Sequence, residues 1–174
     1  GLQYTDQTGQ AACKSSACGA GTYGTATDVA TPPTCTNCVA GRYSGATGLT
    51  SNEQCNKCPL GTWFNTDKAT SRDSCINCVV GKYGDTDGAT AVSACKDCIV
   101  NVEFQDAAGQ PSCKSAACGA GTYGTATGAA TAPSCTNCIA GRYSGATGLT
   151  SSEQCNKCPL GTWLDTDKAT SRGS

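Results

Sequence analysis

The chain has 174 residues, with 12 Lys and Arg against 13 Asp and Glu, so its net charge is -1. Leu, Ile, Val and Phe together number only 18, too few for the single large core of an ordinary enzyme domain. The near-neutral charge argues against a nucleic-acid-binding surface, whereas 16 Cys indicate a disulfide scaffold in an oxidising, extracellular setting.

Two residue types are missing, and their absence narrows the function. Without His the chain lacks the usual general base and the commonest metal ligand, so we expect no enzyme and no cofactor. The sequence begins at Gly1 and contains no Met, which we interpret as a piece of a longer chain. Its apolar runs are far shorter than the roughly 20 residues that span a bilayer.

In chain order, the largest feature is an internal duplication. Residues 101–174 repeat residues 1–74 with 55 identities in 74 pairs. We therefore divide the chain into a first cysteine-rich unit, 1–100, of five repeats of about 20 residues, and a second, near-identical but truncated unit, 101–174.

A pair of cysteines returns in every repeat, and the second cysteine of each pair recurs every 20 residues from Cys18 to Cys158. Most pairs are Cys-x-x-Cys, whereas Cys13–Cys18 and Cys113–Cys118 have four intervening residues. Three residues after the second cysteine comes a glycine, replaced once by Asn101, and two residues later an aromatic. These turn and ring positions are Gly41, Tyr43, Gly61, Trp63, Gly81, Tyr83, Asn101, Gly121, Tyr123, Gly141, Tyr143, Gly161 and Trp163.

The glycine position and the aromatic position each have a physical interpretation. Gly, and after it Asn, tolerates positive φ, so we expect a left-handed turn at the first. At the second, a core role with each ring covering a disulfide is favoured, because a small disulfide module has little else to bury. A stripe of rings that binds carbohydrate is the alternative.

The segments between cysteine pairs show no sustained helical period and are rich in Gly, Thr, Ser and Asp. The sequence therefore predicts a small disulfide-rich repeat protein. We expect an elongated solenoid or rod of mostly turns and short β-ribbons, with almost no helix and with each repeat touching only its neighbours.

Spacing leaves two regular disulfide schemes open. In an interlocked scheme neighbouring pairs join first-to-first and second-to-second, as Cys55–Cys75 with Cys58–Cys78. In a ladder, the second cysteine of one pair joins the first of the next, and Cys13 and Cys158 pair with segments outside this sequence. The ladder pairs are Cys18–Cys35, Cys38–Cys55, Cys58–Cys75, Cys78–Cys95, Cys98–Cys113, Cys118–Cys135 and Cys138–Cys155.

Other chemistry was weighed for the same residues. Paired Cys-x-x-Cys motifs resemble a zinc ribbon, but the unbroken tandem run, the two widened pairs and the lack of His favour disulfides over zinc. Thioredoxin-like redox chemistry is less favoured still. The stretch Asp85-Thr86-Asp87-Gly88 begins like a Ca²⁺ loop without its closing Glu, and we interpret it, like Asp67–Lys68 and Asp167–Lys168, as an exposed turn.

The segment Cys55-Asn56-Lys57-Cys58-Pro59-Leu60-Gly61-Thr62-Trp63 shows the repeat pattern best. It resembles the cysteine-rich repeats of ciliate surface immobilization antigens, and it is also similar to ephrin-receptor-like and tumour-necrosis-factor-receptor-like modules. The ciliate resemblance implies secretion, a structural coat role at the cell surface, and membrane attachment only through a lipid anchor outside this segment.

Two functions follow as hypotheses. The first is a structural, non-catalytic protein of an extracellular surface coat or filament, which self-associates through its regular surface. The second is a receptor or adhesin ectodomain that binds a protein or glycan ligand along its repeats. Because near-identical units suit a covering role better than one ligand site, the first is preferred over the second and over a zinc-bound intracellular scaffold. Numerous Ser and Thr suit both O-glycans and plain polar turns.

Overall fold

The structure is a computed structural model, and it describes residues 2–9, 11–12, 14–25 and 30–172. Cys13, which the ladder pairs with a segment outside the sequence, lies outside the described residues. The chain divides into two compact units, and near residues 78–95 the sequence passes from the first unit to the second and back. Unit 1 comprises Gly1–Asn77 with Gly84–Cys95, and unit 2 comprises Cys78–Tyr83 with Lys96–Ser174. The division at residue 100 expected from the duplication stays a prediction.

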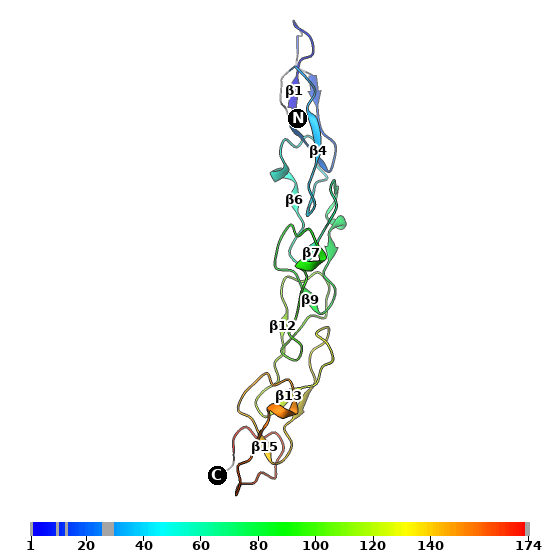
Figure 1. Cartoon of the computed structure of the whole chain (residues 1–174). Helices are drawn as coiled ribbons and strands as arrows, with labels where there is room; N and C mark the ends of the chain where they lie inside the picture. The colour runs from blue at the N-terminus through cyan, green and yellow to red at the C-terminus, as the bar shows by residue number, and fades with distance from the viewer. Residues whose placement is uncertain (1, 10, 13, 26–29, 173–174) are drawn as a thin grey trace. The chain divides into compact units, whose positions relative to one another are not determined.

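The regular structure consists of two-stranded antiparallel ribbons, each made by two short strands close together in sequence (Figure 1). In unit 1 the pairs are β1 (Leu2–Tyr4) with β2 (Lys14–Ser16), β3 (Thr22–Thr25) with β4 (Thr34–Asn37), β5 (Arg42–Tyr43) with β6 (Asn56–Lys57), and β7 (Thr62–Trp63) with β8 (Ile76–Asn77). In unit 2 they are β9 (Lys82–Tyr83) with β10 (Lys96–Asp97), β11 (Glu103–Phe104) with β12 (Lys114–Ser115), β13 (Thr122–Gly124) with β14 (Cys135–Asn137), and β15 (Arg142–Tyr143) with β16 (Asn156–Lys157).

The sequence grid explains each ribbon. The first strand follows the turn glycine and carries the aromatic, and the second includes residues that lie between the two cysteines of a pair. In the β5–β6 ribbon, Tyr43 lies opposite Asn56. Cys55 and Cys58 are buried, whereas Asn56 between them is exposed. This Cys-x-x-Cys motif is thus a short extended segment with a buried cysteine at each end, whereas Cys35 and Cys135 at the start of other motifs are exposed.

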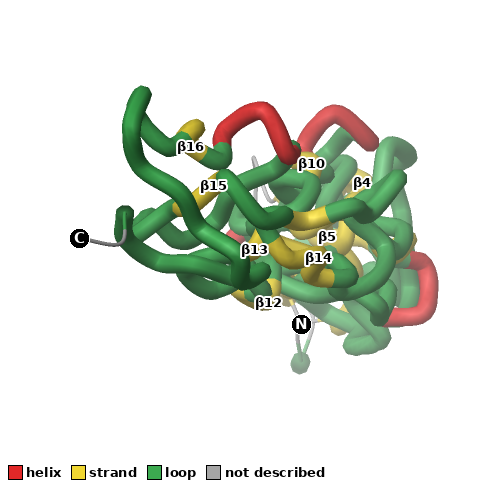
Figure 2. The backbone as a smooth tube through the Cα atoms, turned by 90° about the horizontal axis from the view of Figure 1, so that it is seen from below, coloured by secondary structure: helices red, strands yellow, loops and turns green. Residues whose placement is uncertain are grey.

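In the described part of the chain, helix is confined to single 3₁₀ turns, and loops make up most of the backbone (Figure 2). The turns lie just before the first cysteine of a pair: η1 (Asn52–Gln54), η2 (Arg72–Ser74), η3 (Val92–Ala94) and η4 (Ser152–Gln154). At η1 the Gln54 side-chain oxygen accepts hydrogen bonds from the N–H groups of Thr50 (2.7 Å) and Ser51 (3.3 Å). This capping arrangement fixes how the loop enters the turn that leads to Cys55.

Each disulfide loop forms a module that begins at the second cysteine of one pair, for example 38–57 and 58–77. Successive modules are joined by backbone hydrogen bonds: the Gly24 N–H donates to the carbonyl oxygen of Leu49 (2.7 Å) in the next module. Parallel bridges lie beside such bonds, between Tyr23 and Leu49 and between Tyr43 and Ala69. Because these contacts use backbone atoms, the modules cohere without a large apolar core.

Sulfur makes up most of the buried core that does exist. Among the residues that the structure describes, ten of the thirteen buried apolar ones are cysteines, and Cys38 is wholly inaccessible to solvent. The others are Ala69, Ala89 and Leu149. The predicted fold class is confirmed: this is a disulfide-rich repeat protein of turns and short ribbons.

Candidate functional site

The disulfides follow the ladder. Fourteen of the described cysteines are disulfide-bonded, and Cys78 and Cys95 are among them. The bonds include Cys18–Cys35, Cys38–Cys55, Cys58–Cys75, Cys98–Cys113, Cys118–Cys135 and Cys138–Cys155. Cys158 is a free cysteine of intermediate exposure.

This pairing differs from the interlocked scheme and from a zinc ribbon. Cys55 and Cys58 belong to different disulfides, with Cys38 and Cys75 respectively, so each Cys-x-x-Cys motif links two consecutive loops. Among the described residues, no group of three or more His, Cys, Asp or Glu side chains is arranged to hold a metal ion. In this structure each disulfide closes the loop of its own module, as Cys38–Cys55 does in 38–57 and Cys58–Cys75 in 58–77.

The turn glycines have left-handed backbones. φ is 76° at Gly41, 79° at Gly61 and 79° at Gly141, and Asn101 has φ 67°. The same turn carries two inter-module hydrogen bonds: Gly41 N–H donates to the Phe64 carbonyl and Cys58 N–H donates to the Gly41 carbonyl, both at 2.8 Å. Both the N–H and the carbonyl of Gly41 are therefore bonded to the following module, 58–77.

One sequence-based expectation is wrong, namely that each repeat touches only its neighbours. A Cβ atom on Gly21 would lie 2.6 Å from the carbonyl oxygen of Lys68, two modules further along. Gly41 and Gly88 have the same relationship, and Lys57 pairs with Asp87 (3.1 Å) across the same interval. Next-but-one modules meet because glycine has no side chain there, a close approach of backbones that leaves no apolar signature in the sequence.

The ring positions are half-buried, with one exception. Tyr123 packs against the cluster of Cys138, Leu149 and Cys155, so this ring covers the disulfide of the following module, as the core interpretation expects. Trp163 is 76% exposed, because the residue that would correspond to the Ala89 partner of Trp63 is not part of this sequence. Its equivalent Trp63 is half-buried and bridges Ala89.

Sequence reasoning missed a second left-handed position, ten residues after the second cysteine. φ is 75° at Gly48, 66° at Lys68 and 65° at Gly88. Each of these N–H groups donates to the carbonyl of a cysteine in the preceding module, as Lys68 does to Cys38 (2.9 Å). The position escapes detection because it alternates between Gly and Lys, and a left-handed Lys has no sequence signature.

The charges predicted to be exposed turn residues do more than face solvent. The Asp67 carboxylate accepts a hydrogen bond from the Ala40 N–H (2.9 Å), and Asp167 accepts one from Ala140 at the same distance. In the stretch that resembles a Ca²⁺ loop, Asp87 is engaged by Lys57. Asp67 and Asp167 thus join adjacent modules, whereas Asp87 joins next-but-one modules.

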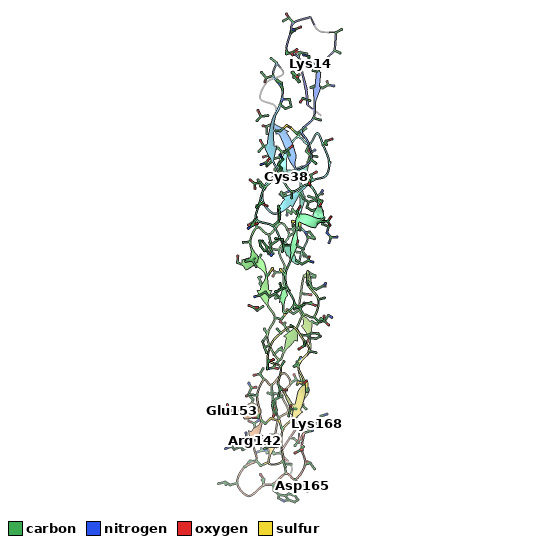
Figure 3. All side chains as sticks on the ribbon, turned by 90° about the vertical axis from the view of Figure 1, so that its right-hand side faces the viewer. Lys14, Cys38, Arg142, Glu153, Asp165 and Lys168 are labelled. Atoms are coloured by element: carbon green, nitrogen blue, oxygen red, sulfur yellow. A yellow bond between two sulfur atoms is a disulfide. The ribbon has the colours of Figure 1, made fainter. Side chains whose placement is uncertain are left out.

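A cation follows the turn glycine in several modules. The Arg42 guanidinium donates through Nη1 to the carbonyl oxygens of Asn52 (3.2 Å) and Cys55 (2.8 Å). The Glu53 carboxylate accepts hydrogen bonds from the Glu53 N–H and from the Ser51 hydroxyl. These bonds, with a smaller contribution from the Arg42 charge, hold the pKa of Glu53 below its ordinary value. Arg142 repeats the contact to Cys155 (2.9 Å), and Figure 3 shows Arg142 and Glu153 on the same edge of unit 2.

Each of the two widened cysteine pairs encloses a lysine that forms an ion pair with an aspartate. Lys14 contacts Asp6, and Lys114 contacts Asp106 (2.5 Å) while its ammonium lies 5.5 Å from the Phe104 ring centre. The hydrogen bond from Lys114 lowers the pKa of Asp106, and the bond to Asp6 raises the pKa of Lys14. These pairs are exposed and add little stability.

Exposed apolar side chains recur, module after module, in the turn between the cysteine pair and the turn glycine. The exposed fractions are 60% for Val79, 60% for Ile99 and 63% for Ile139. Because packing does not require apolar residues at these places, the turns are candidate contact points for a partner.

Comparison with known proteins shows a similarity in part of the chain. A family model described as tyrosine-protein kinase ephrin type A/B receptor-like matches residues 41–95. The match covers the modules with the most regular Cys-x-x-Cys pattern, so this part of the chain is similar to a cysteine-rich receptor module. No curated protein matches the chain. Within the described part of the chain, every helix is too short to cross a membrane.

Proposed function

We propose that this chain is part of a structural, non-catalytic protein of an extracellular surface coat or filament. The observation that carries the proposal is repetition at the level of individual bonds. Gly21 N–H donates to the Ser44 carbonyl and Gly121 N–H to the Ser144 carbonyl, both at 2.8 Å. A protein that presents the same local structure again and again suits covering a surface.

The cell surface is the proposed location, because the core consists mainly of oxidised cysteine. Such disulfides persist outside the cell and are reduced in the cytosol. The resemblance to ciliate immobilization antigens supports this location. Attachment through a lipid anchor outside this segment, lateral self-association and O-glycans on the exposed Ser and Thr belong to the same proposal.

The second candidate function is that of a receptor or adhesin ectodomain. It is favoured by the match of residues 41–95 to the ephrin-receptor-like family and by the exposed Val79, Ile99 and Ile139. In this case differences between modules would matter more than their likeness, because a single ligand selects one place along the chain.

Immunogold labelling of intact, unpermeabilised source cells with an antibody against this chain distinguishes the two. A dense, continuous layer of label supports the coat. Sparse label that clusters when a ligand is added supports the receptor. Label found only after permeabilisation contradicts both proposals.

A further inference from the structure

Module 58–77 contains a cavity at a place where two other modules carry an arginine side chain. The cavity has a volume of about 370 Å³ and is lined by Pro59, Thr62, Arg72, Asp73, Cys75 and Asn77. We call it the Thr62 cavity. Thr62 directly follows the turn glycine Gly61, and its hydroxyl donates to the Pro59 carbonyl (2.7 Å), so its short side chain is held at one wall.

The equivalent position holds arginine in two other modules. Arg42 and Arg142 occupy the place of Thr62, and Arg42 donates to the carbonyls of Asn52 and Cys55. A smaller hollow, of about 240 Å³, remains beside Arg142. The chain thus shows twice what kind of group fits there.

The acceptors that receive Arg42 have counterparts at the Thr62 cavity. Turns η1 and η2 close in the same way, with Cys55 N–H donating to the Asn52 carbonyl (3.1 Å) and Cys75 N–H to the Arg72 carbonyl (2.9 Å). The carbonyl oxygens of Arg72 and Cys75 therefore take the places of those on Asn52 and Cys55. A carbonyl oxygen has two lone pairs, so a second donor is accommodated as it is at Asn52.

The remaining lining favours a cation that is held mainly by carbonyls. Asp73 takes the place of Glu53, a carboxylate whose pKa is lowered in part by the nearby Arg42 charge. The charge of Arg72 offsets that of Asp73, which weakens the purely Coulombic attraction. Recognition then depends on directed hydrogen bonds to carbonyl oxygens, for which a planar guanidinium with five donors is suited.

The module with lysine shows that an ammonium behaves differently. Lys82 takes the place of Arg42 in module 78–97, and it donates to the Asp97 carboxylate across the ribbon (2.5 Å). In module 58–77 the residue at the place of Asp97 is Asn77, which is uncharged. The cavity therefore lacks the partner that a lysine uses and keeps those that an arginine uses.

We propose that the Thr62 cavity binds the guanidinium group of an arginine side chain from a partner polypeptide. Arginine enters where Arg42 and Arg142 lie in their own modules, and its Nη atoms donate to the carbonyl oxygens of Arg72 and Cys75. The site is independent of whether the protein is a coat or a receptor, because either would use it to dock a second chain.

The test is a titration of the full chain with N-acetylarginine methylamide, followed by the backbone amide NMR signals of Asp73, Cys75 and Asn77. Saturable shifts confined to module 58–77 are expected. N-acetyllysine methylamide should bind about tenfold more weakly, because an ammonium loses at least one charge-assisted hydrogen bond.

Two matched variants complete the experiment. Thr62→Arg fills the cavity from within and should abolish the shifts, and it is expected to fold because modules 38–57 and 138–157 carry arginine at this position. Arg42→Thr should create a second responsive site around Cys55. The proposal is overturned by unsaturable or dispersed shifts in the native chain, by shifts that persist in Thr62→Arg, or by equal binding of the lysine compound.

Discussion

Gly21 faces the carbonyl oxygen of Lys68 so closely that a Cβ atom on the glycine would lie 2.6 Å from that oxygen. Both residues have positive φ, 73° and 66°. The two left-handed positions of the repeat are therefore partners across two modules. At Gly21 the first position requires glycine for this contact, and glycine also adopts the positive φ without strain, whereas the second position tolerates lysine.

Alanine substitutions at Gly41 and Gly141 should separate these two requirements. The glycines share a sequence context and similar φ values, but a Cβ at Gly41 would collide with Gly88, whereas one at Gly141 meets nothing within 4 Å because the residue equivalent to Gly88 is not part of this 174-residue chain. We expect Gly141→Ala to cost ~1 kcal/mol through backbone strain. Gly41→Ala should cost about 2–4 kcal/mol because overpacking is added. Denaturant unfolding of each variant measures this difference, and equal costs would show that next-but-one contacts are energetically irrelevant.

Removing one rung of the ladder should destabilise its module strongly. The bond Cys58–Cys75 spans a sequence separation of 17, and the loop-entropy model gives ~3 kcal/mol for its closure. The double variant Cys58→Ala, Cys75→Ala should make residues 58–77 the first site of limited proteolysis. Thr66→Ala serves as the control, because this exposed residue lies in the same loop and its loss should leave the cleavage pattern unchanged.

The ion pair between Asp106 and Lys114 should show itself in acid. The pKa of Asp106 is lowered from its ordinary 3.8 by the hydrogen bond from Lys114. A lowered folded-state pKa stabilises the fold above pH 3.8, and that contribution is lost as the pH falls through the folded-state value. NMR titration of the Asp106 carboxyl should give a value that rises toward 3.8 in Lys114→Gln. An unchanged value in that variant would contradict the assigned cause.

Asn101 replaces glycine at one turn and adds a bond that glycine lacks. Its Oδ1 accepts from the Ala126 N–H (2.7 Å). Asn101→Gly keeps the left-handed turn and loses this bond, so it should cost about 0.5–1.5 kcal/mol. Asn101→Ala should cost ~1 kcal/mol more, because alanine disfavours positive φ. Faster hydrogen exchange at Ala126 in both variants checks the bond, and an unchanged rate would argue against it.

The sequence allowed the repeat, the ribbons and the left-handed glycine turn to be predicted, because each depends on residues that recur in register. Gly41 and Cys58 illustrate this, since their spacing and type indicate a turn and a cross-link. Spacing alone left the ladder and the interlocked scheme open, as both join cysteines in adjacent pairs at regular intervals.

The contacts between modules were beyond sequence reasoning. The meeting of Gly21 and Lys68 involves backbone atoms, and the left-handed Lys68 has no preferred residue type to indicate it. The Thr62 cavity arises from a side chain that is shorter than its counterparts Arg42 and Arg142. The effect of that difference is evident only once the carbonyls that bind Arg42 are placed.

The most direct test of this account is disulfide mapping of the native protein, with peptides separated without reduction and at a pH that prevents exchange. The ladder predicts cross-linked peptides that contain Cys38 with Cys55 and Cys58 with Cys75. Peptides that join Cys55 to Cys75 and Cys58 to Cys78, or free thiols at these positions, would contradict it.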